Sequence, residues 1–423
     1  MQSIRAVVLQ ALYVLALVVL AGAYVRSAWL VPQRNYPFDF SINYTGARLL
    51  VALGRDANIY DRVALAAEAA PYTGYTALYT KLFLTYIQTP LTAVLLVPVA
   101  RLEMDDARTT VLAVSNVMLL AAAGIMLVAL RPTRLLVLSA FLLYATFEPM
   151  FDSLRLGQVD ALIVLLFSLS FWALRRGNHW LVGLSLAGPA ILKVSPVLVI
   201  GYFVVRRWWR VVIGAAIGGL FLLGLSVAAA GWHNHRAFVQ ETLPRLSKGS
   251  TFYDNVSLPG AITRAHFGEA SWYWEDEVPE WPPALRLSVL ALTAAIVLGG
   301  YAIARRDAEV GFMLAIAIAV LVAPISWSFY PTWLIPSLLF LVARYQQRRA
   351  WGRLALLAAL YPLLAVVPAH FSVVSDQVYR YPIKTVVLAL YCGLLAWETQ
   401  SRSATRSVGP AEVPHPAAAG AHP

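Results

Sequence analysis

The sequence has few charged residues. Asp, Glu, Lys and Arg make up 13% of its 423 residues, whereas soluble proteins carry about 25%. Apolar residues make up 60% of the chain, which is enough for roughly a dozen membrane spans of about 20 residues. These proportions exclude an ordinary soluble domain. They predict an all-α polytopic membrane protein, because helices satisfy their own backbone hydrogen bonds in lipid.

Cysteine and clustered histidine are also scarce. Cys392 is the single cysteine, which excludes an internal disulfide and a cysteine-based metal site. The seven histidines are scattered, and His233 with His235 is too small a set for a metal site. A Gly-rich phosphate loop, a G-x-S-x-G elbow and a nucleotide-binding domain are missing as well. We therefore expect neither a metal nor another cofactor.

Basic residues outnumber acidic ones, 33 to 22. They form short knots between apolar runs rather than one basic face, so we do not expect nucleic acid as a partner. The positive-inside rule instead predicts that the knots lie on the cytoplasmic side of the membrane. The knots are Arg131/Arg134, Arg175/Arg176, Arg206/Arg207/Arg210, Arg305/Arg306 and Arg344/Arg348/Arg349/Arg353.

Apolar runs divide residues 1–400 into about 12 predicted transmembrane helices. They cover about 7–28, 109–130, 135–148, 159–174, 180–193, 196–206, 211–230, 284–304, 310–325, 331–344, 352–368 and 382–398. The two short runs that flank Lys193–Pro196 predict a bent hairpin. Residues 401–423 are rich in Pro, Ala and Ser and predict a disordered cytoplasmic tail.

One further apolar stretch, residues 83–100, does not fit as a span. A full crossing there would invert every later segment and place the Arg knots outside. The stretch also contains Gln88 and Pro90. We therefore predict that it lies in the membrane plane or re-enters from the outer side. Two large outer loops result, at about 29–108 and 231–283, and a functional site is expected there.

Asp39 lies in the first outer loop, just after the first predicted span. Its carboxylate could cap a helix or simply be solvated. It could also act as a general base that accepts the proton of an attacking hydroxyl. The aromatic residues around it, Tyr44 among them, suit either a sugar-stacking wall or an interfacial belt.

Lys193 interrupts an otherwise apolar hairpin. A charge at membrane depth is costly and points to function, although a lysine can also extend its ammonium to the interface. The functional interpretation is a point charge that holds a lipid phosphate. Arg155 and Arg108 also lie on the predicted outer side, against the positive-inside trend, and are candidates for the same anion.

Other polar and aromatic residues of the outer segments are candidates for substrate binding. They are Tyr44, Gln158, Asn255, Arg264, Trp327 and Tyr330.

In their order and spacing, these motifs resemble glycosyltransferase family 87, a bacterial branch of the GT-C superfamily of polytopic glycosyltransferases. The resemblance runs from about residue 36 to residue 345. It rests on Asp39, Tyr44, Gly54, Tyr60-Asp61, Tyr86, Pro90, Gly157-Gln158-Val159-Asp160, Lys193-x-x-Pro196, Asn255-x-Ser257-Leu258 and Pro324-Ile325-Ser326-Trp327. One departure follows the last motif, where the family usually has His and this chain has Ser328-Phe329-Tyr330.

The resemblance implies a GT-C fold with in-plane helices in the outer loops. It also implies a hexosyltransferase of the bacterial cytoplasmic membrane, whose active site faces the extracytoplasmic side. The expected donor is a polyprenyl-phosphate sugar, typically mannose, and the sugar passes with inversion to a lipid or glycan acceptor. In this scheme Asp39 is the catalytic carboxylate, and Lys193 matches the Lys of the family's K-x-x-P element.

Two rival functions share some of these features. A lipid-linked saccharide transporter would place ionisable residues near the middle of several spans, and apart from Lys193 the predicted spans contain few. A glycan polymerase or ligase would share the outer loops and the cations. The position of Asp39 close behind the first span favours the monosaccharide transferase.

Overall fold

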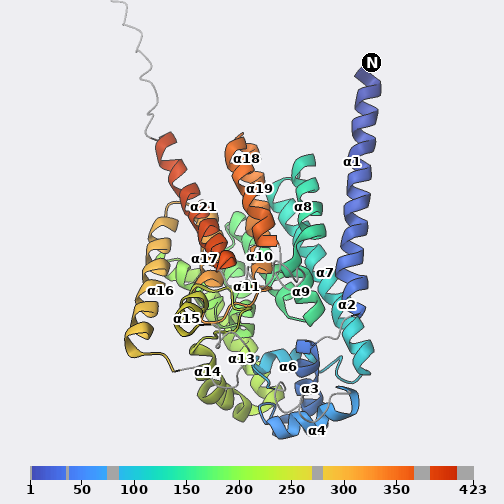
Figure 1. Cartoon of the computed structure of the whole chain (residues 1–423), viewed down its shortest axis with the longest axis vertical. Coiled ribbons are helices and arrows are strands. Elements are labelled where there is room, and N and C mark those ends of the chain that lie inside the picture. Colours follow the sequence, from blue (N-terminus) through green and yellow to red (C-terminus); the bar gives the residue numbers. More distant parts are fainter. Residues whose placement is uncertain (1, 35–37, 74–84, 269–279, 366–381, 407–423) are drawn as a thin grey trace, which may run out of the picture.

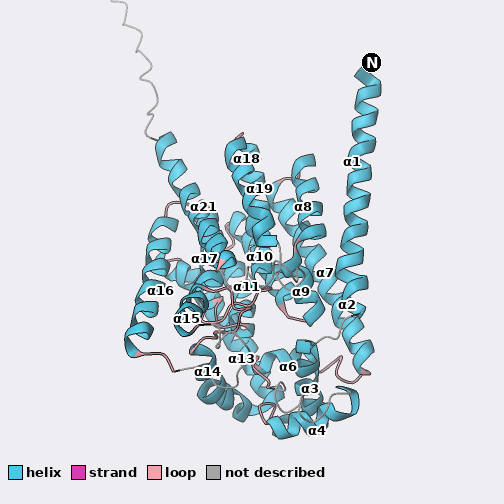
Figure 2. Cartoon of the chain, viewed as in Figure 1, coloured by secondary structure: helices cyan, strands magenta, loops and turns pink. Residues whose placement is uncertain are grey.

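The computed structural model describes residues 2–34, 38–73, 85–268, 280–365 and 382–406. Within these ranges the regular structure is helical, which confirms the predicted all-α class (Figure 2). The elements up to α10 are α1 (Gln2–Val25), η1 (Arg26–Leu30), α2 (Val31–Arg34), α3 (Phe38–Leu53), η2 (Gly54–Asp56), α4 (Arg62–Thr73), α6 (Pro90–Leu96), α7 (Met104–Leu130), α8 (Arg134–Thr146), α9 (Glu148–Leu156) and α10 (Asp160–Arg175).

The second half of the chain is helical in the same way. Its elements are α11 (His179–Leu192), α12 (Val197–Val205), α13 (Trp209–Ala237), η3 (Phe238–Thr242), α14 (Leu243–Ser247), α15 (Leu258–Phe267), α16 (Pro283–Ala304), α17 (Ala308–Val322), η5 (Tyr330–Leu334), α18 (Ile335–Gln347), α19 (Trp351–Ala365) and α21 (Ile383–Arg406). The predicted break at Lys193–Pro196 is confirmed, since α11 ends at Leu192 and α12 begins at Val197.

Within the described ranges, four helical stretches are long and apolar enough to cross a membrane: Ile4–Arg34, Met104–Leu130, Trp209–Ser247 and Pro283–Ala304. A fifth is possible if α8 and α9, which meet at a bend of 49°, form one broken span. The described part of every predicted apolar run is mostly helical. Several of these helices are shorter than a bilayer crossing requires, so the count of about 12 spans stays a prediction.

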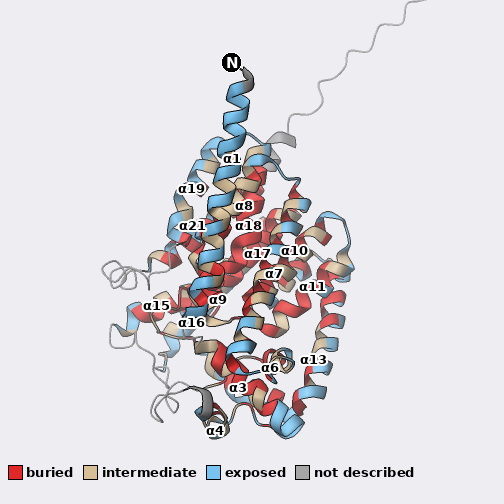
Figure 3. Cartoon of the chain, turned by 90° about the vertical axis from the view of Figure 1, so that its right-hand side faces the viewer, coloured by how far each residue is buried: buried red, intermediate tan, exposed pale blue. Residues whose placement is uncertain are grey.

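The helix α17 forms the centre of the bundle. Every residue from Val310 to Val322 is buried, so the helix has no polar face. Such all-round apolar character is typical of a helix enclosed on every side. Figure 3 shows this buried centre, while α1 and α13 present exposed residues to the surroundings. Exposed Leu and Val side chains along α1 are consistent with lipid contact.

Several elements of the two predicted outer loops gather at one end of the molecule. α3, α4, α6 and α14 lie opposite the end that holds the N-terminus and the last turns of α21 (Figure 1). The stretch predicted to lie in the membrane plane is described from residue 85 and contains α6, which packs against α3 and α13. Its in-plane orientation stays a prediction. α21 continues through Arg406, six residues into the predicted tail, and residues 407–423 lie outside the described ranges.

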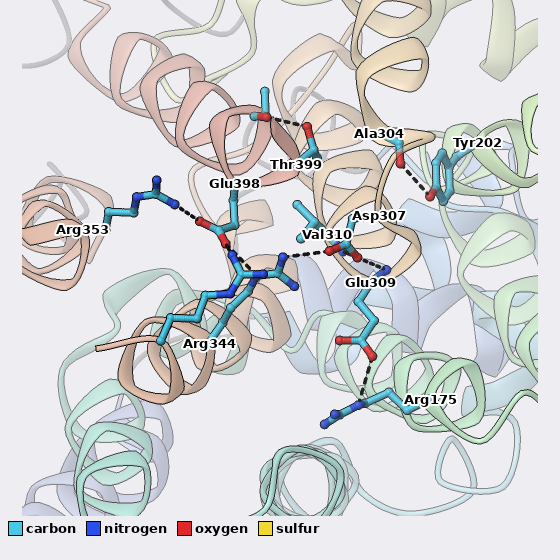
Figure 4. Close-up of polar contacts among 12 residues, drawn as sticks. Arg175, Tyr202, Ala304, Asp307, Glu309, Val310, Arg344, Arg353, Glu398 and Thr399 are labelled. Atoms are coloured by element: carbon cyan, nitrogen blue, oxygen red, sulfur yellow. Dashed lines mark hydrogen bonds and ion pairs between the residues drawn. The ribbon is translucent and has the colours of Figure 1, made fainter. Parts of the chain in front are cut away.

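A buried ion cluster joins the helices at the opposite end (Figure 4). Glu398 of α21 is 1% exposed. It accepts hydrogen bonds from Arg344 at 2.7 Å, from Arg353 at 2.6 Å and from Arg348. Arg344 also pairs with Asp307 at 2.8 Å. Buried charges need such partners, and these bonds fix α18, α19 and α21 against the start of α17.

Candidate active site

The structure brings Asp39 and Lys193 together through one side chain, Gln158. The Nε2 group of Gln158 donates a hydrogen bond to Oδ2 of Asp39. Its Oε1 atom accepts a hydrogen bond from Nζ of Lys193 at 3.2 Å. An amide suits this place because one end donates and the other accepts. Asp39 and Gln158, 119 positions apart, and Lys193, 35 positions further on, thus form one polar row.

A glycine allows the close approach of α3 to this row. Gly157 ends α9 in the left-handed region with φ of +68°, a conformation that favours glycine. A Cβ atom at this position would lie 2.6 Å from Cβ of Phe40. Asp39 directly precedes Phe40, and Gln158 directly follows Gly157. The tight contact between Gly157 and Phe40 therefore sets Asp39 beside Gln158.

Lys193 lies in a pocket of polar and aromatic groups and is only 6% exposed. Its Nζ atom is 3.3 Å from the hydroxyl oxygen of Tyr330 and 4.3 Å from the centre of that ring. It is 4.0 Å from a carboxylate oxygen of Asp160, which is fully buried. Asp160 in turn accepts hydrogen bonds from Trp333 at 2.6 Å and from Ser153 at 3.0 Å. These partners hold the ammonium charge in place.

The environment of Asp39 tunes its acidity. Burial raises the pKa of Asp39 to about 6, while the hydrogen bond from Gln158 and the charge of Lys193 lower it. A carboxyl group with this pKa is about nine-tenths ionised at pH 7. Because the basicity of a carboxylate increases with its pKa, Asp39 is suited to accept a proton at neutral pH.

A cavity of about 690 Å³ opens beside Lys193. Lys193, Trp327 and Tyr330 line it together with apolar residues of α12 and α16. Other charged residues in its wall are Lys248, Glu280 and Arg286. Val197 and Leu290, which also line it, are about half exposed on the outside of the bundle. The cavity thus reaches from the polar row to a surface suited to lipid.

Two predicted substrate-binding residues brace the loop beside this cavity. Asn255 is fully buried and donates to the carbonyls of Ser250 and Pro324, while its Oδ1 atom accepts from the backbone nitrogens of Ser257 and Ser326. Arg264 donates to the carbonyls of Phe252 and Asn255. Because backbone groups occupy these polar atoms, both residues have a positioning role in the structure.

The other predicted residues differ in where they lie. Tyr44 is 2% exposed, and its hydroxyl donates to the carbonyl of Leu102 at 2.7 Å, which anchors α3. Arg155 forms an ion pair with Asp152 in its own helix. A described hydrogen bond of Arg108 goes to the carbonyl of Pro32 in α2. Of the three predicted cations, Lys193 is the one for which the described residues show a hydrogen bond to Gln158.

Sequence reasoning missed Asp152 and Trp333, and it quoted Asp160 within a motif without giving it a role in the site. Asp160 ends the Gly-Gln-Val-Asp motif, and an ionisable residue at the edge of an apolar run is itself a functional signal. Asp152 gives no comparable signal, because it stands in a short polar helix and its partner Ser328 is 176 positions away. Trp333 resembles any interfacial tryptophan until its bond to Asp160 is known.

The chain is similar in sequence to several mannosyltransferases. No solved structure is significantly similar to the chain. A polyprenol-phosphate-mannose-dependent alpha-(1-2)-phosphatidylinositol mannoside mannosyltransferase of Mycobacterium tuberculosis is 25% identical over 359 residues, which cover 78% of this chain and 81% of the relative. The protein of the same description from Mycolicibacterium smegmatis is 25% identical over 297 residues, covering 63% and 64% of the two chains.

A second type of relative acts on a different acceptor. A polyprenol-phosphate-mannose-dependent alpha-(1-2)-phosphatidylinositol pentamannoside mannosyltransferase of M. tuberculosis is 23% identical over 237 residues, covering 55% of this chain and 52% of the relative. The model of glycosyltransferase family 87 matches residues 86–325, which is more than half of the chain and includes Gln158 and Lys193. The chain therefore belongs to glycosyltransferase family 87 and is a membrane-embedded hexosyltransferase.

Proposed function

We propose that this enzyme transfers mannose from a polyprenyl phosphate to a hydroxyl group of a lipid-anchored glycan, with inversion at the anomeric carbon. The observation that carries the proposal is the bridge from Asp39 through Gln158 to Lys193. It combines a base for the acceptor and a cation for the departing phosphate at one place. The relatives named above use polyprenol-phosphate-mannose and a phosphatidylinositol mannoside, which supports the same donor and acceptor classes here.

In the proposed reaction Asp39 takes the proton of the acceptor hydroxyl. The acceptor oxygen forms a bond to the anomeric carbon as the bond from that carbon to the phosphate oxygen breaks. The electron pair of the broken bond leaves with polyprenyl phosphate, and the proton stays on the Asp39 carboxylate. The pKa of about 6 supports this role, because the carboxyl group is largely ionised at neutral pH before the reaction.

Lys193 would stabilise the negative charge that grows on the departing phosphate. Its ammonium is already desolvated and held by Tyr330, Gln158 and Asp160. A charge fixed in advance stabilises a transition state more than one that must reorient. Lys248 and Arg286, which line the same cavity, add positive charge along the path of the donor.

The cavity suits a donor whose head group and tail differ in polarity. Its polar inner end contains Lys193 and Tyr330, and its apolar walls from α12 and α16 suit an isoprenoid chain. The half-exposed side chains of Val197 and Leu290 mark the side at which that chain would leave toward lipid. We place the reaction on the extracytoplasmic side, because the Asp39 helix lies at the end opposite the Arg-rich cluster (Figures 1 and 4).

The test uses the purified protein in nanodiscs with radiolabelled polyprenyl-phosphate mannose and a phosphatidylinositol mannoside. The proposal expects a labelled lipid larger than the acceptor, with release of polyprenyl phosphate in equal amount. Release of free mannose without labelled lipid, or movement of the intact donor between leaflets, would contradict it. The second result would favour the transporter. A preparation inactivated by heat is the control for transfer that does not need the protein.

A further inference from the structure

A second polar cluster lies next to the row of Asp39, Gln158 and Lys193. Its members are Asp152 of α9, Asp254 of the second outer loop, Ser328 of the loop before η5, and Lys384 in the first turn of α21. The reaction described above uses none of them. They come from four separate parts of the chain, so the fold rather than the local sequence brings them together.

Ser328 interacts with both carboxyl groups of this cluster. Its hydroxyl donates to Oδ2 of Asp152 at 3.3 Å, and interactions with Ser328 lower the pKa of Asp254. Trp327 and Tyr330, which flank Ser328 in the sequence, line the donor cavity instead. One short segment therefore presents some side chains to the donor cavity and another to the carboxyl groups.

Lys384 is the member whose polar atom is left unpaired. The residue is 6% exposed, and among the described residues its Nζ atom has no hydrogen-bond partner. The carboxyl groups of Asp254, Asp152 and Glu148 lie within electrostatic range of it. A buried ammonium without a partner is costly and calls for an occupant. Its carboxylate neighbours indicate the kind of ligand that fits.

A neutral ligand with several hydroxyl groups fits this cluster better than an anion. Carboxylates accept hydrogen bonds from hydroxyl groups, and an ammonium donates to hydroxyl oxygens. Burial and the charge of Asp152 raise the pKa of Asp254 to about 7, so near pH 7 that carboxyl group also donates. A phosphate bound in this cluster would lie beside the carboxyl groups of Asp152 and Asp254 and only one ammonium, that of Lys384. This arrangement disfavours an anion.

We propose that Lys384, Asp254 and Ser328, with Asp152 behind them, bind the sugar or cyclitol ring of the acceptor that receives the mannose. This inference rests on the proposed function. Asp39 is within electrostatic range of Asp152, so a ring bound here would lie near the base.

The first experiment measures binding without transfer. Saturation-transfer NMR follows methyl α-D-mannopyranoside with the full chain in nanodiscs, as wild type, Lys384→Gln and Asp254→Asn. We expect saturable binding to wild type and a Kd raised about tenfold or more in each variant, the effect of one lost charge-assisted hydrogen bond. Equal affinity in all three proteins, or displacement by inorganic phosphate but not by free mannose, would overturn the proposal.

The second experiment separates acceptor from donor in the transfer assay. We expect Lys384→Gln to raise KM for the phosphatidylinositol mannoside about tenfold or more, to leave KM for the donor within about twofold, and to be partly rescued by Lys384→Arg. Equal increases of both KM values would overturn the proposal while the transferase assignment stands. If wild type binds the glycoside but transfers no mannose, the proposed function fails and the binding site stands. If Lys384→Gln does not fold, Asp254→Asn replaces it in both assays, because the Asp254 side chain is partly exposed.

Discussion

Replacement of Gln158 by Leu would separate Asp39 from Lys193 at nearly constant side-chain volume. The hydrogen bond from Gln158 lowers the pKa of Asp39, which is about 6 in the native protein. A hydrogen bond to a charged group contributes about 1.5–3 kcal/mol, and one pKa unit corresponds to about 1.4 kcal/mol. Loss of the bond would therefore raise the pKa of Asp39 by about one to two units, to about 7–8.

This shift predicts a specific change in the pH profile. At pH 7 the ionised fraction of Asp39 would fall from about nine-tenths to between about one-half and one-tenth. The assay is kcat/KM for the donor between pH 5 and 9. We expect a two- to tenfold loss at pH 7 from this cause, reduced at pH 9, with the acid limb moved upward.

A matched control is Gln88→Leu, which makes the same substitution in the wall of the donor cavity. Gln88 does not touch Asp39 in the described structure, so the acid limb should stay near pH 6 in this variant. An unchanged pH profile in Gln158→Leu would refute the reasoning, because the group that titrates could not then be a carboxylate held by Gln158.

Three more predictions concern other charged groups. In the wild type, activity should be level above pH 7 and fall about tenfold per pH unit below about pH 6, since the base must be ionised. Lys193→Met should lower kcat about 10²–10³-fold, as the loss of one transition-state partner does. Lys193→Arg keeps the positive charge and should retain more activity than Lys193→Met. Equal activity of the two variants would contradict a charge-based role. Glu398→Gln should lower the free energy of unfolding by about 3–5 kcal/mol, which is measured as a lower Tm. The control is Glu309→Gln, because Glu309 pairs with Arg175 where both side chains are about 30% exposed. This substitution should change the free energy of unfolding by about 1 kcal/mol or less.

Local patterns in the sequence predicted much of the fold. Apolar runs placed the helices, because the period and length of a run depend only on neighbouring residues. The break at Lys193–Pro196 was predictable for the same reason. The number of crossings was not, since short helices such as α12, with nine residues, can be buried among others or span part of the bilayer.

The candidate site could be predicted only in part. Asp39, Gln158 and Lys193 each stand out locally, yet their contact depends on the packing of Gly157 against Phe40. Asn255 looked like a ligand-binding amide, whereas four backbone groups occupy its side chain. Such contacts join residues far apart in the chain, so no spacing rule reveals them.

The most direct test of the central claim is the rate of mannose transfer by Asp39→Asn, measured with donor binding in the same preparation. Asn keeps the size of the side chain and can still meet Gln158 after rotation of its amide, but it cannot accept the proton. We predict that transfer falls at least 10²-fold, within the usual contribution of a general base, while the Kd for polyprenyl-phosphate mannose changes less than about threefold. Transfer at the wild-type rate would contradict the account, because the hydroxyl proton would then be accepted elsewhere.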